Sequence, residues 1–83
     1  MKKCLIHLRV PSIRREYDVW MPQDVQIRTV CQVLADGIRE MSEGLYCCSD
    51  KEMLIKPENE WLLNPEKCLM DYDIADGDEL ILL

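Results

Sequence analysis

The sequence lacks most of the residues from which catalytic and ligand-binding motifs are built. It contains one histidine, three glycines and no phenylalanine. A phosphate-cradling loop needs closely spaced glycines, and Gly37, Gly44 and Gly77 stand too far apart to form one. No run of eighteen apolar residues occurs, so we expect neither a membrane-inserted helix nor a signal peptide. We expect the 83 residues to form a single domain, residues 1–83.

Positive charge is also scarce. The sequence contains ten Lys and Arg and sixteen Asp and Glu, which gives a net charge of −6. Nucleic acids and anionic membranes attract basic surfaces, so this balance argues against both as the main partner and favours a basic protein. Residues 42–83 carry three Lys and Arg against eleven acids, which either solubilise loops or mark an acidic docking surface.

The five cysteines are an odd number without regular spacing. No pair has the short separation of a zinc site, and adjacent Cys47 and Cys48 are poorly placed to bridge each other. We therefore expect no metal, no cofactor and a reducing, cytoplasmic location. Cys4 and Cys31 fall on apolar faces and should be buried, which leaves Cys47 and Cys48 as the candidates for a thiol sensor.

Two alternating segments predict a hairpin at the start of the chain. Apolar residues at every second position of Lys3–Val10 predict a strand with one face on a core. Pro11-Ser12 supplies turn residues, and the alternation resumes over Tyr17–Met21 before it stops at Pro22. The two strands should therefore pair in antiparallel fashion.

The next segment has the spacing of one amphipathic helix. Apolar residues recur over Ile27–Met41 at intervals of three and four, with polar residues between them. We expect Asp24 to cap the start of the helix and Gly44 to end it. Gly37 costs about 1 kcal/mol relative to Ala inside a helix, so we expect the helix to approach the sheet closely there.

The second half of the chain is predicted to form short strands separated by turns. The strands are expected at Met53–Lys56, Trp61–Leu63 and Glu79–Leu83, with one helical turn at Leu69–Tyr72 and a tight turn at Asp76-Gly77-Asp78. A hairpin, one helix and further strands pack best as an α+β fold, a mixed sheet of four to five strands with the helix across one face. This is the β-grasp arrangement.

The face of the sheet that points away from the helix is a candidate protein-binding surface. In a β-grasp sheet the first strand lies between the second and the last, so their outward residues should lie side by side. The candidate partner-binding face consists of Leu5, His7, Trp20, Ile81 and Leu83. A Trp among aliphatic residues is typical of a binding face, and scattered surface apolar residues are the alternative.

Neither the histidine nor the aspartates indicate a catalytic or metal site. His7 has no nucleophile or acid near it in a recognisable motif, so we expect no enzymatic activity. A second candidate surface, an acidic docking edge, comprises Asp71, Asp73, Asp76 and Asp78. An EF-hand loop starting at the first of these would have Ala75 and Leu82 at ligand positions, so turn formation is the alternative role of the four acids.

The closing segment, residues 69–83, has the sequence LMDYDIADGDELILL. It resembles the end of ubiquitin, where Leu-x-Asp-Tyr-x-Ile precedes a last strand with Leu-x-Leu. It is more similar still to the YukD-like and EsaB-like ubiquitin-fold proteins of WXG100 (type VII) secretion systems, which end in Asp-Tyr-x-Ile-x-x-Gly-Asp-x-Leu-x-x-Leu. Residues 17–22 and the helix from Ile27 also resemble theirs. The resemblance covers nearly the whole chain and is strongest from Leu62 to Leu83.

This resemblance implies a ubiquitin-like domain that serves as a cytoplasmic accessory protein and not as an enzyme. Its partners would be membrane or ATPase components of the secretion machinery, bound noncovalently. Conjugated ubiquitins and bacterial sulfur carriers end in Gly-Gly, whereas this sequence stops at Leu83, so we expect neither conjugation nor sulfur transfer.

Two other functions stay open. A ubiquitin-like modifier or sulfur carrier would need processing that exposes a C-terminal Gly-Gly. A PB1-like self-association module would pair the acids between Asp73 and Asp78 with Arg14 and Arg15 of a second copy, which would give a weak homodimer.

Overall fold

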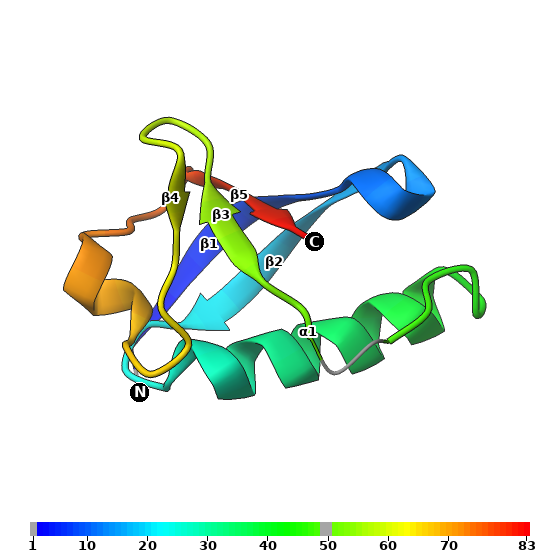
Figure 1. Ribbon diagram of the computed structural model, residues 1–83, viewed down its shortest axis with the longest axis horizontal. Coiled ribbons are helices and arrows are strands. Elements are labelled where there is room, and N and C mark those ends of the chain that lie inside the picture. The colour runs from blue at the N-terminus through cyan, green and yellow to red at the C-terminus, as the bar shows by residue number, and fades with distance from the viewer. Residues whose placement is uncertain (1, 49–50) are drawn as a thin grey trace.

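The computed structural model describes residues 2–48 and 51–83. The elements are β1 Lys3–Val10, η1 Pro11–Ile13, β2 Arg15–Pro22, α1 Ile27–Met41, β3 Leu54–Lys56, β4 Trp61–Leu62, η2 Leu69–Tyr72 and β5 Glu79–Leu82, where η denotes a 3-10 helix. The strands form one sheet in the order β2-β1-β5-β3-β4, and α1 crosses one of its faces (Figure 1). Strands β1 and β5 run parallel, and the other pairs are antiparallel. The predicted α+β, β-grasp fold is confirmed, with five strands.

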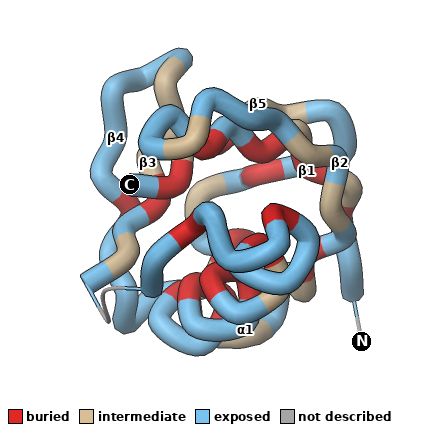
Figure 2. The backbone as a smooth tube through the Cα atoms, turned by 90° about the vertical axis from the view of Figure 1, so that its right-hand side faces the viewer, coloured by how far each residue is buried: buried red, intermediate tan, exposed pale blue. Residues whose placement is uncertain are grey.

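The core lies between α1 and the sheet, as Figure 2 shows by the buried segments that face each other. Strand β1 lies inside the sheet, between β2 and β5, and alternates as predicted, with its even-numbered residues from Cys4 to Val10 buried. Burial of each large aliphatic side chain contributes about 1.5–3 kcal/mol. The buried side chains of β1 and of its two neighbours, the antiparallel strand β2 and the parallel strand β5, therefore form one apolar layer under the helix. The odd-numbered residues of β1 face away from the helix.

Helix α1 begins at the predicted residue but without the predicted cap. The N-cap position is Gln26, not Asp24, and it makes no side-chain capping bond. Instead the Ile27 N–H donates to the Lys67 carbonyl at 2.8 Å, and the Arg28 N–H donates to the Pro65 carbonyl at 3.0 Å. A helix start leaves its first N–H groups without intrahelical acceptors. A loop distant in sequence supplies two of those acceptors here.

The end of α1 confirms the predicted stop at Gly44, which has φ 84°. The Gly44 N–H donates to the Arg39 carbonyl at 2.8 Å and the Glu43 N–H to the Glu40 carbonyl at 3.1 Å, the two bonds of a Schellman motif. The expectation for Gly37 was wrong, because a Cβ added there would meet no atom within 4 Å. Close packing therefore does not explain a glycine at that position.

The helix end yields a stability prediction at Glu43. This residue has φ 55°, a left-handed conformation that costs a non-glycine residue about 1–2 kcal/mol. We expect Glu43→Gly to raise the free energy of unfolding by about 1 kcal/mol, since the added flexibility of the unfolded chain offsets part of the relief. Urea denaturation of the variant and of wild type measures this difference in the free energy of unfolding. Glu40→Gly inside the helix is the matched control and should lower stability by about 1 kcal/mol; a decrease for both variants would contradict the prediction.

Candidate functional site

The outward face of the sheet brings Leu5 and Trp20 together. The two residues are directly opposite in the pairing of β1 with β2. Trp20 is 62% exposed and Leu5 is half-buried. Side chains opposite each other on neighbouring strands have Cβ atoms about 4.5–5.5 Å apart. The pair therefore forms one exposed apolar spot at the β2 edge of the sheet, which we call the Trp20 pair.

A charged band follows along β1. The His7 Nδ1 lies 3.0 Å from Asp18 Oδ1, and its Nε2 lies 2.5 Å from Glu16 Oε1. The hydrogen bonds to Asp18 and then to Glu16 raise the pKa of His7 above its ordinary value, because they favour the imidazolium. Beside it, Arg9 Nη2 donates to Glu79 Oε2 of β5 at 2.9 Å. The geometry makes His7 an ion-pair partner on the surface.

A second apolar group lies beyond the charged band. Ile81 of β5 is opposite Ile55 of β3, which is opposite Leu62 of β4. We call these three residues the aliphatic row. Leu83 extends it at the end of β5, where its N–H and carbonyl exchange hydrogen bonds with Met53 at 2.9 and 3.1 Å. Two members of the row come from short strands that the sequence reasoning did not connect with the candidate face.

The five predicted face residues are therefore not side by side. Leu5 and Trp20 form the Trp20 pair, Ile81 and Leu83 belong with the aliphatic row, and His7 stands between the two groups among carboxylates. The expectation of one continuous apolar patch is corrected to two apolar groups separated by charge. The reason is that acids on β2 and β5 share the outward face with β1. A binding role for either group stays a prediction.

The charged band predicts a measurable pH dependence. Because the folded-state pKa of His7 is raised above 6.5, its contribution to stability is fully present below pH 6.5 and is lost as the pH rises through the folded-state pKa. NMR titration of this single histidine should give a pKa above 6.5. The variant Glu16→Gln/Asp18→Asn should move it back towards 6.5 and flatten the fall of urea stability over that range. A wild-type pKa at or below 6.5 would refute the arrangement.

The candidate acidic edge is used largely for local structure. Three of its carboxylates accept backbone hydrogen bonds: Asp71, Asp76 and Asp78 bond the N–H groups of Cys68, Leu5 and Ala75 at 2.8, 2.9 and 3.0 Å. The fourth, Asp73, has φ 55° and closes η2. Turn formation, the alternative that the sequence left open, accounts for the geometry of Asp71, Asp73 and Asp78, whereas Asp76 ties its turn to the distant strand β1. Docking at this edge stays a prediction.

The buried cysteines are unsuited to nucleophilic chemistry. Cys4 and Cys31 are buried as expected. Burial raises the pKa of the Cys31 thiol to about 11, and burial followed by the charge of Asp76 raises the pKa of Cys4. Thiols with raised pKa values stay protonated and react slowly. Over residues 2–48 and 51–83, no group of three or more His, Cys, Asp or Glu side chains is arranged to hold a metal ion.

An apolar groove runs between β2 and α1, and the sequence reasoning missed it. Its volume is about 80 Å³, and it is lined by Trp20, Met21, Pro22, Val25, Thr29, Val30, Val33 and Leu34. Val33 is apolar but 66% exposed, because it lies outside the buried stripe of α1. An apolar residue outside that stripe was the feature of the sequence that could have indicated the groove. In the described part of the chain, α1 and the other helical segments are too short or too polar to cross a membrane.

Neither protein-family models nor curated proteins gave a match. Solved structures did. The ubiquitin-like domain of the Mycobacterium tuberculosis type VII secretion system protein EccD1 is 18% identical, with a TM-score of 0.77 over 100% of this chain and 99% of that chain. The EccD5 ubiquitin-like domain from Mycobacterium xenopi is 19% identical, with a TM-score of 0.71 over 100% and 94%.

A eukaryotic domain is similar to the same degree. The UBL domain of Plasmodium falciparum Dsk2 is 16% identical, with a TM-score of 0.74 over 98% of this chain and 96% of that chain. At such identities the similarity concerns the fold. One fold thus serves proteins of different systems, and function has to be argued from surfaces. The chain has a ubiquitin-like fold of the kind found in the ubiquitin-like domains of type VII secretion proteins.

Proposed function

We propose that this protein is a noncovalent cytoplasmic accessory protein of a WXG100 (type VII) secretion system, of the YukD-like or EsaB-like kind. It binds membrane or ATPase components of the machinery and is neither an enzyme nor conjugated to other proteins. The observation that carries the proposal is the match, along the whole chain, to the ubiquitin-like domain of EccD1. The segment from Leu69 to Leu83, which resembles the end of YukD-like proteins, supports it independently.

The surface supports a binding role. Trp20 is 62% exposed on a sheet face that also carries Leu5. Trp side chains are on average highly buried in proteins that bind no partner, so an exposed Trp beside another apolar residue favours a binding surface. Trp residues are enriched among the side chains that dominate binding energy at interfaces. The net charge of −6 favours basic partner surfaces. The domain therefore combines an exposed aromatic anchor with long-range attraction for cations.

The test is a comparison of native and denaturing pull-downs. The protein is tagged at its N-terminus, recovered from its own cytoplasm and membranes, and analysed by mass spectrometry. Secretion-machinery components should co-purify natively and disappear on denaturation. Failure to recover any such component natively would refute the proposal.

The modifier alternative has an observation in its favour, because the Caldiarchaeum subterraneum ubiquitin has the same fold with a TM-score of 0.69 over 98% of this chain. The same pull-down separates the two functions. A ladder of larger species that survives denaturation and reduction would establish covalent attachment. We propose the noncovalent role because the two type VII domains match over the full chain with higher TM-scores, 0.77 and 0.71.

The self-association alternative has a weaker basis. The hairpin that carries Arg14 and the acidic segment after η2 lie towards opposite ends of the molecule, so copies could contact head to tail (Figure 1). However, the carboxylates of Asp76 and Asp78 already accept backbone hydrogen bonds. Gel filtration at low and high salt tests it. Oligomers that dissociate with salt would support self-association, and a monomer at both would exclude it.

A further inference from the structure

A hollow lies between β4 and η2, which are neighbours at one end of the molecule (Figure 1). We call it the β4 hollow. Its volume is about 470 Å³, and small-ligand sites in proteins have volumes of roughly 300–1,000 Å³. The strands β4 and β2 form the two opposite edges of the sheet, so the β4 hollow is separate from the Trp20 pair. The residues that line it are Glu60, Trp61, Leu62, Asp71 and Tyr72.

Two aromatic rings form part of the wall of the β4 hollow. The ring centroids of Trp61 and Tyr72 are 6.1 Å apart, and the ring planes are tilted by 52°, a geometry in which aromatic rings attract each other. The Asn64 N–H donates to the Tyr72 hydroxyl oxygen at 2.9 Å, which ties this ring to the chain that follows β4. The two rings are therefore held in place before any ligand binds, and Trp61 is still 46% exposed.

Two exposed carboxylates line the same hollow. The Cys68 N–H donates to Asp71 Oδ2 at 2.8 Å, which fixes Asp71 in η2. A carboxylate has about four acceptor sites, so this bond leaves capacity for a ligand. The second carboxylate, Glu60, directly precedes Trp61, and its backbone N–H donates to the Pro57 carbonyl at 3.3 Å. Carboxylates beside an aromatic ring are a combination that attracts an organic cation.

The ring of Trp61 already attracts one cation within the protein. Lys56, which is opposite Trp61 in the pairing of β3 with β4, places its Nζ 5.8 Å from the ring centroid. This is within the limit of about 6 Å for a cation–π interaction. Lys56 does not line the β4 hollow, so the part of the ring that faces the hollow is left for a second cation. The carboxylates of Glu60 and Asp71 outnumber this ammonium group, which favours a positively charged ligand.

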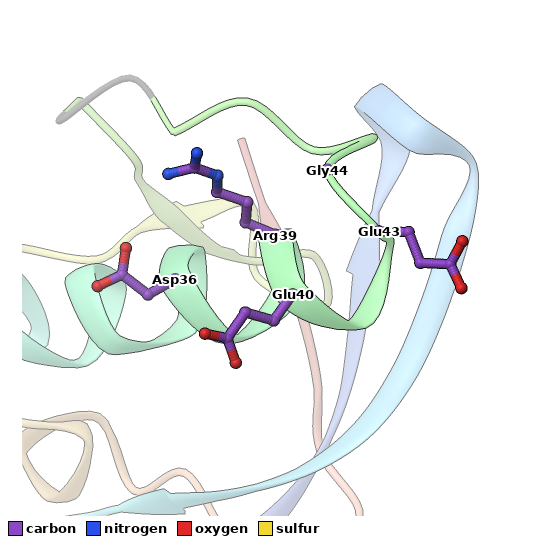
Figure 3. Close-up of a pocket in the computed structure, with 5 residues that line it drawn as sticks. All are labelled: Asp36, Arg39, Glu40, Glu43 and Gly44. Carbon is purple, nitrogen blue, oxygen red and sulfur yellow. The ribbon is translucent and has the colours of Figure 1, made fainter.

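A hollow at the end of α1 shows what the aromatic pair adds. This α1 hollow has a volume of about 530 Å³ and is lined by Asp36, Arg39, Glu40, Glu43 and Gly44. Figure 3 shows the carboxylates of Asp36 and Glu40 on one side of the helix ribbon and the guanidinium of Arg39 on the other. No aromatic side chain of the described residues lines it. Acids without an aromatic surface do not select an organic cation, so the α1 hollow serves only as a comparison.

We propose that the β4 hollow binds a guanidinium group, carried by an arginine side chain or by a free guanidino compound. The planar group stacks on the Trp61 ring, and its N–H groups donate to the carboxylates of Glu60 and Asp71. A guanidinium fits better than a primary ammonium because it is planar and more weakly hydrated. It also fits better than a quaternary ammonium, which has no N–H to donate to the carboxylates. This site is additional to the contact with secretion components and does not depend on it.

The probe is N-acetyl-arginine N-methylamide, and its control is the citrulline counterpart, which has nearly the same shape but no charge. Titration into isotope-labelled protein, followed by NMR, should give saturable shifts with a Kd of about 1–10 mM. The shifts should be largest at the Trp61 indole N–H and at the amides of Glu60 and Tyr72. The citrulline probe should bind at least about tenfold more weakly, because it lacks the cation.

A second probe, methylguanidinium, distinguishes the two sources of the ligand. Equal affinity of methylguanidinium and the arginine probe would support the site as one for a free guanidino compound. Binding of the arginine probe that is tighter by about threefold or more would support an arginine side chain as the ligand, because the rest of the residue then adds contacts.

Four variants test the assigned roles. Lys56→Gln should strengthen binding of the arginine probe about twofold to threefold, because it removes a competing cation from the Trp61 ring. Glu60→Gln should weaken binding about threefold, and Trp61→Leu should weaken it at least about tenfold. The first two replace exposed or half-buried polar side chains, so they test the site even if Trp61→Leu fails to fold. Trp20→Leu is the matched control and should leave the affinity within about twofold of wild type.

Absence of saturable shifts, equal binding of the citrulline probe, or shifts centred on Trp20 or on the α1 hollow would each overturn the inference. The native pull-down keeps it distinct from the proposed function. Trp61→Leu should recover secretion components within about twofold of wild type, since the β4 hollow is separate from the Trp20 pair. A failed titration therefore leaves the proposed function intact, and a pull-down without secretion components leaves the guanidinium site intact.

Discussion

Leu80→Ala should lower the free energy of unfolding by about 2–5 kcal/mol, measured by urea denaturation. Leu80 has no exposed surface, and it lies opposite Leu8 in the parallel pairing of β5 with β1. Truncation removes its transfer free energy and leaves a cavity between two central strands that cannot collapse freely. An 83-residue domain has a total stability of about 4–12 kcal/mol, so the variant should be near the limit of folding at 37 °C.

The matched control is Leu83→Ala, the same substitution three residues further on. Leu83 is 50% exposed, so its truncation should change stability by no more than about 0.5 kcal/mol. Equal or reversed effects of the two substitutions would contradict the assigned register of β5. That register buries Leu80 and exposes Leu83, and a shift by one residue would exchange the two positions.

The second large effect concerns binding. Leu5→Ser/Trp20→Ser should reduce native recovery of secretion components about 30-fold or more, since truncation of a central Trp anchor costs about 2 kcal/mol or more. The fold should survive, because Trp20 is 62% exposed and Leu5 faces away from the helix. Quantitative mass spectrometry of matched pull-downs measures the loss, and circular dichroism checks the fold.

The control for this variant is Leu45→Ser/Trp61→Ser. These residues are of the same types, and both are exposed, at 54% for Leu45 and 46% for Trp61, but neither belongs to the Trp20 pair. Recovery should be within about twofold of wild type. Unchanged recovery by the Leu5/Trp20 variant would remove the Trp20 pair as a contact, and a loss confined to the control would place the contact near Trp61 instead.

Local periodicity was enough to predict most of the fold. The alternation in β1 and the helical spacing over Ile27–Met41 gave the correct elements and buried faces, because a strand or helix with one apolar face has few ways to bury it. The helix ends at Met41, and Gly44 contributes to the stop as expected: its N–H closes the Schellman motif, and its positive φ of 84° suits glycine. Each of the three short strands is one residue shorter than predicted, because pairing with its neighbours decides where it ends.

The candidate surface was predicted less well. Leu5 and Trp20 were correctly assigned to the outward face, but their separation from Ile81 was not foreseen. Residues on different strands become neighbours through register, and the parallel pairing sets His7 against Glu79 and Arg9 against Ile81. A charged band therefore crosses a face that alternation alone presents as apolar.

Spacing within each segment was enough to specify which residues form the main elements and which of their faces are buried, because both properties are local. Contacts between segments follow only from the three-dimensional packing of the chain. The carbonyls of Pro65 and Lys67 replaced Asp24 at the helix start, and the groove beside Val33 arose where α1 passes the open edge of β2. Such features depend on the placement of distant segments, which follows from packing of the whole core and not from the pattern of any one segment.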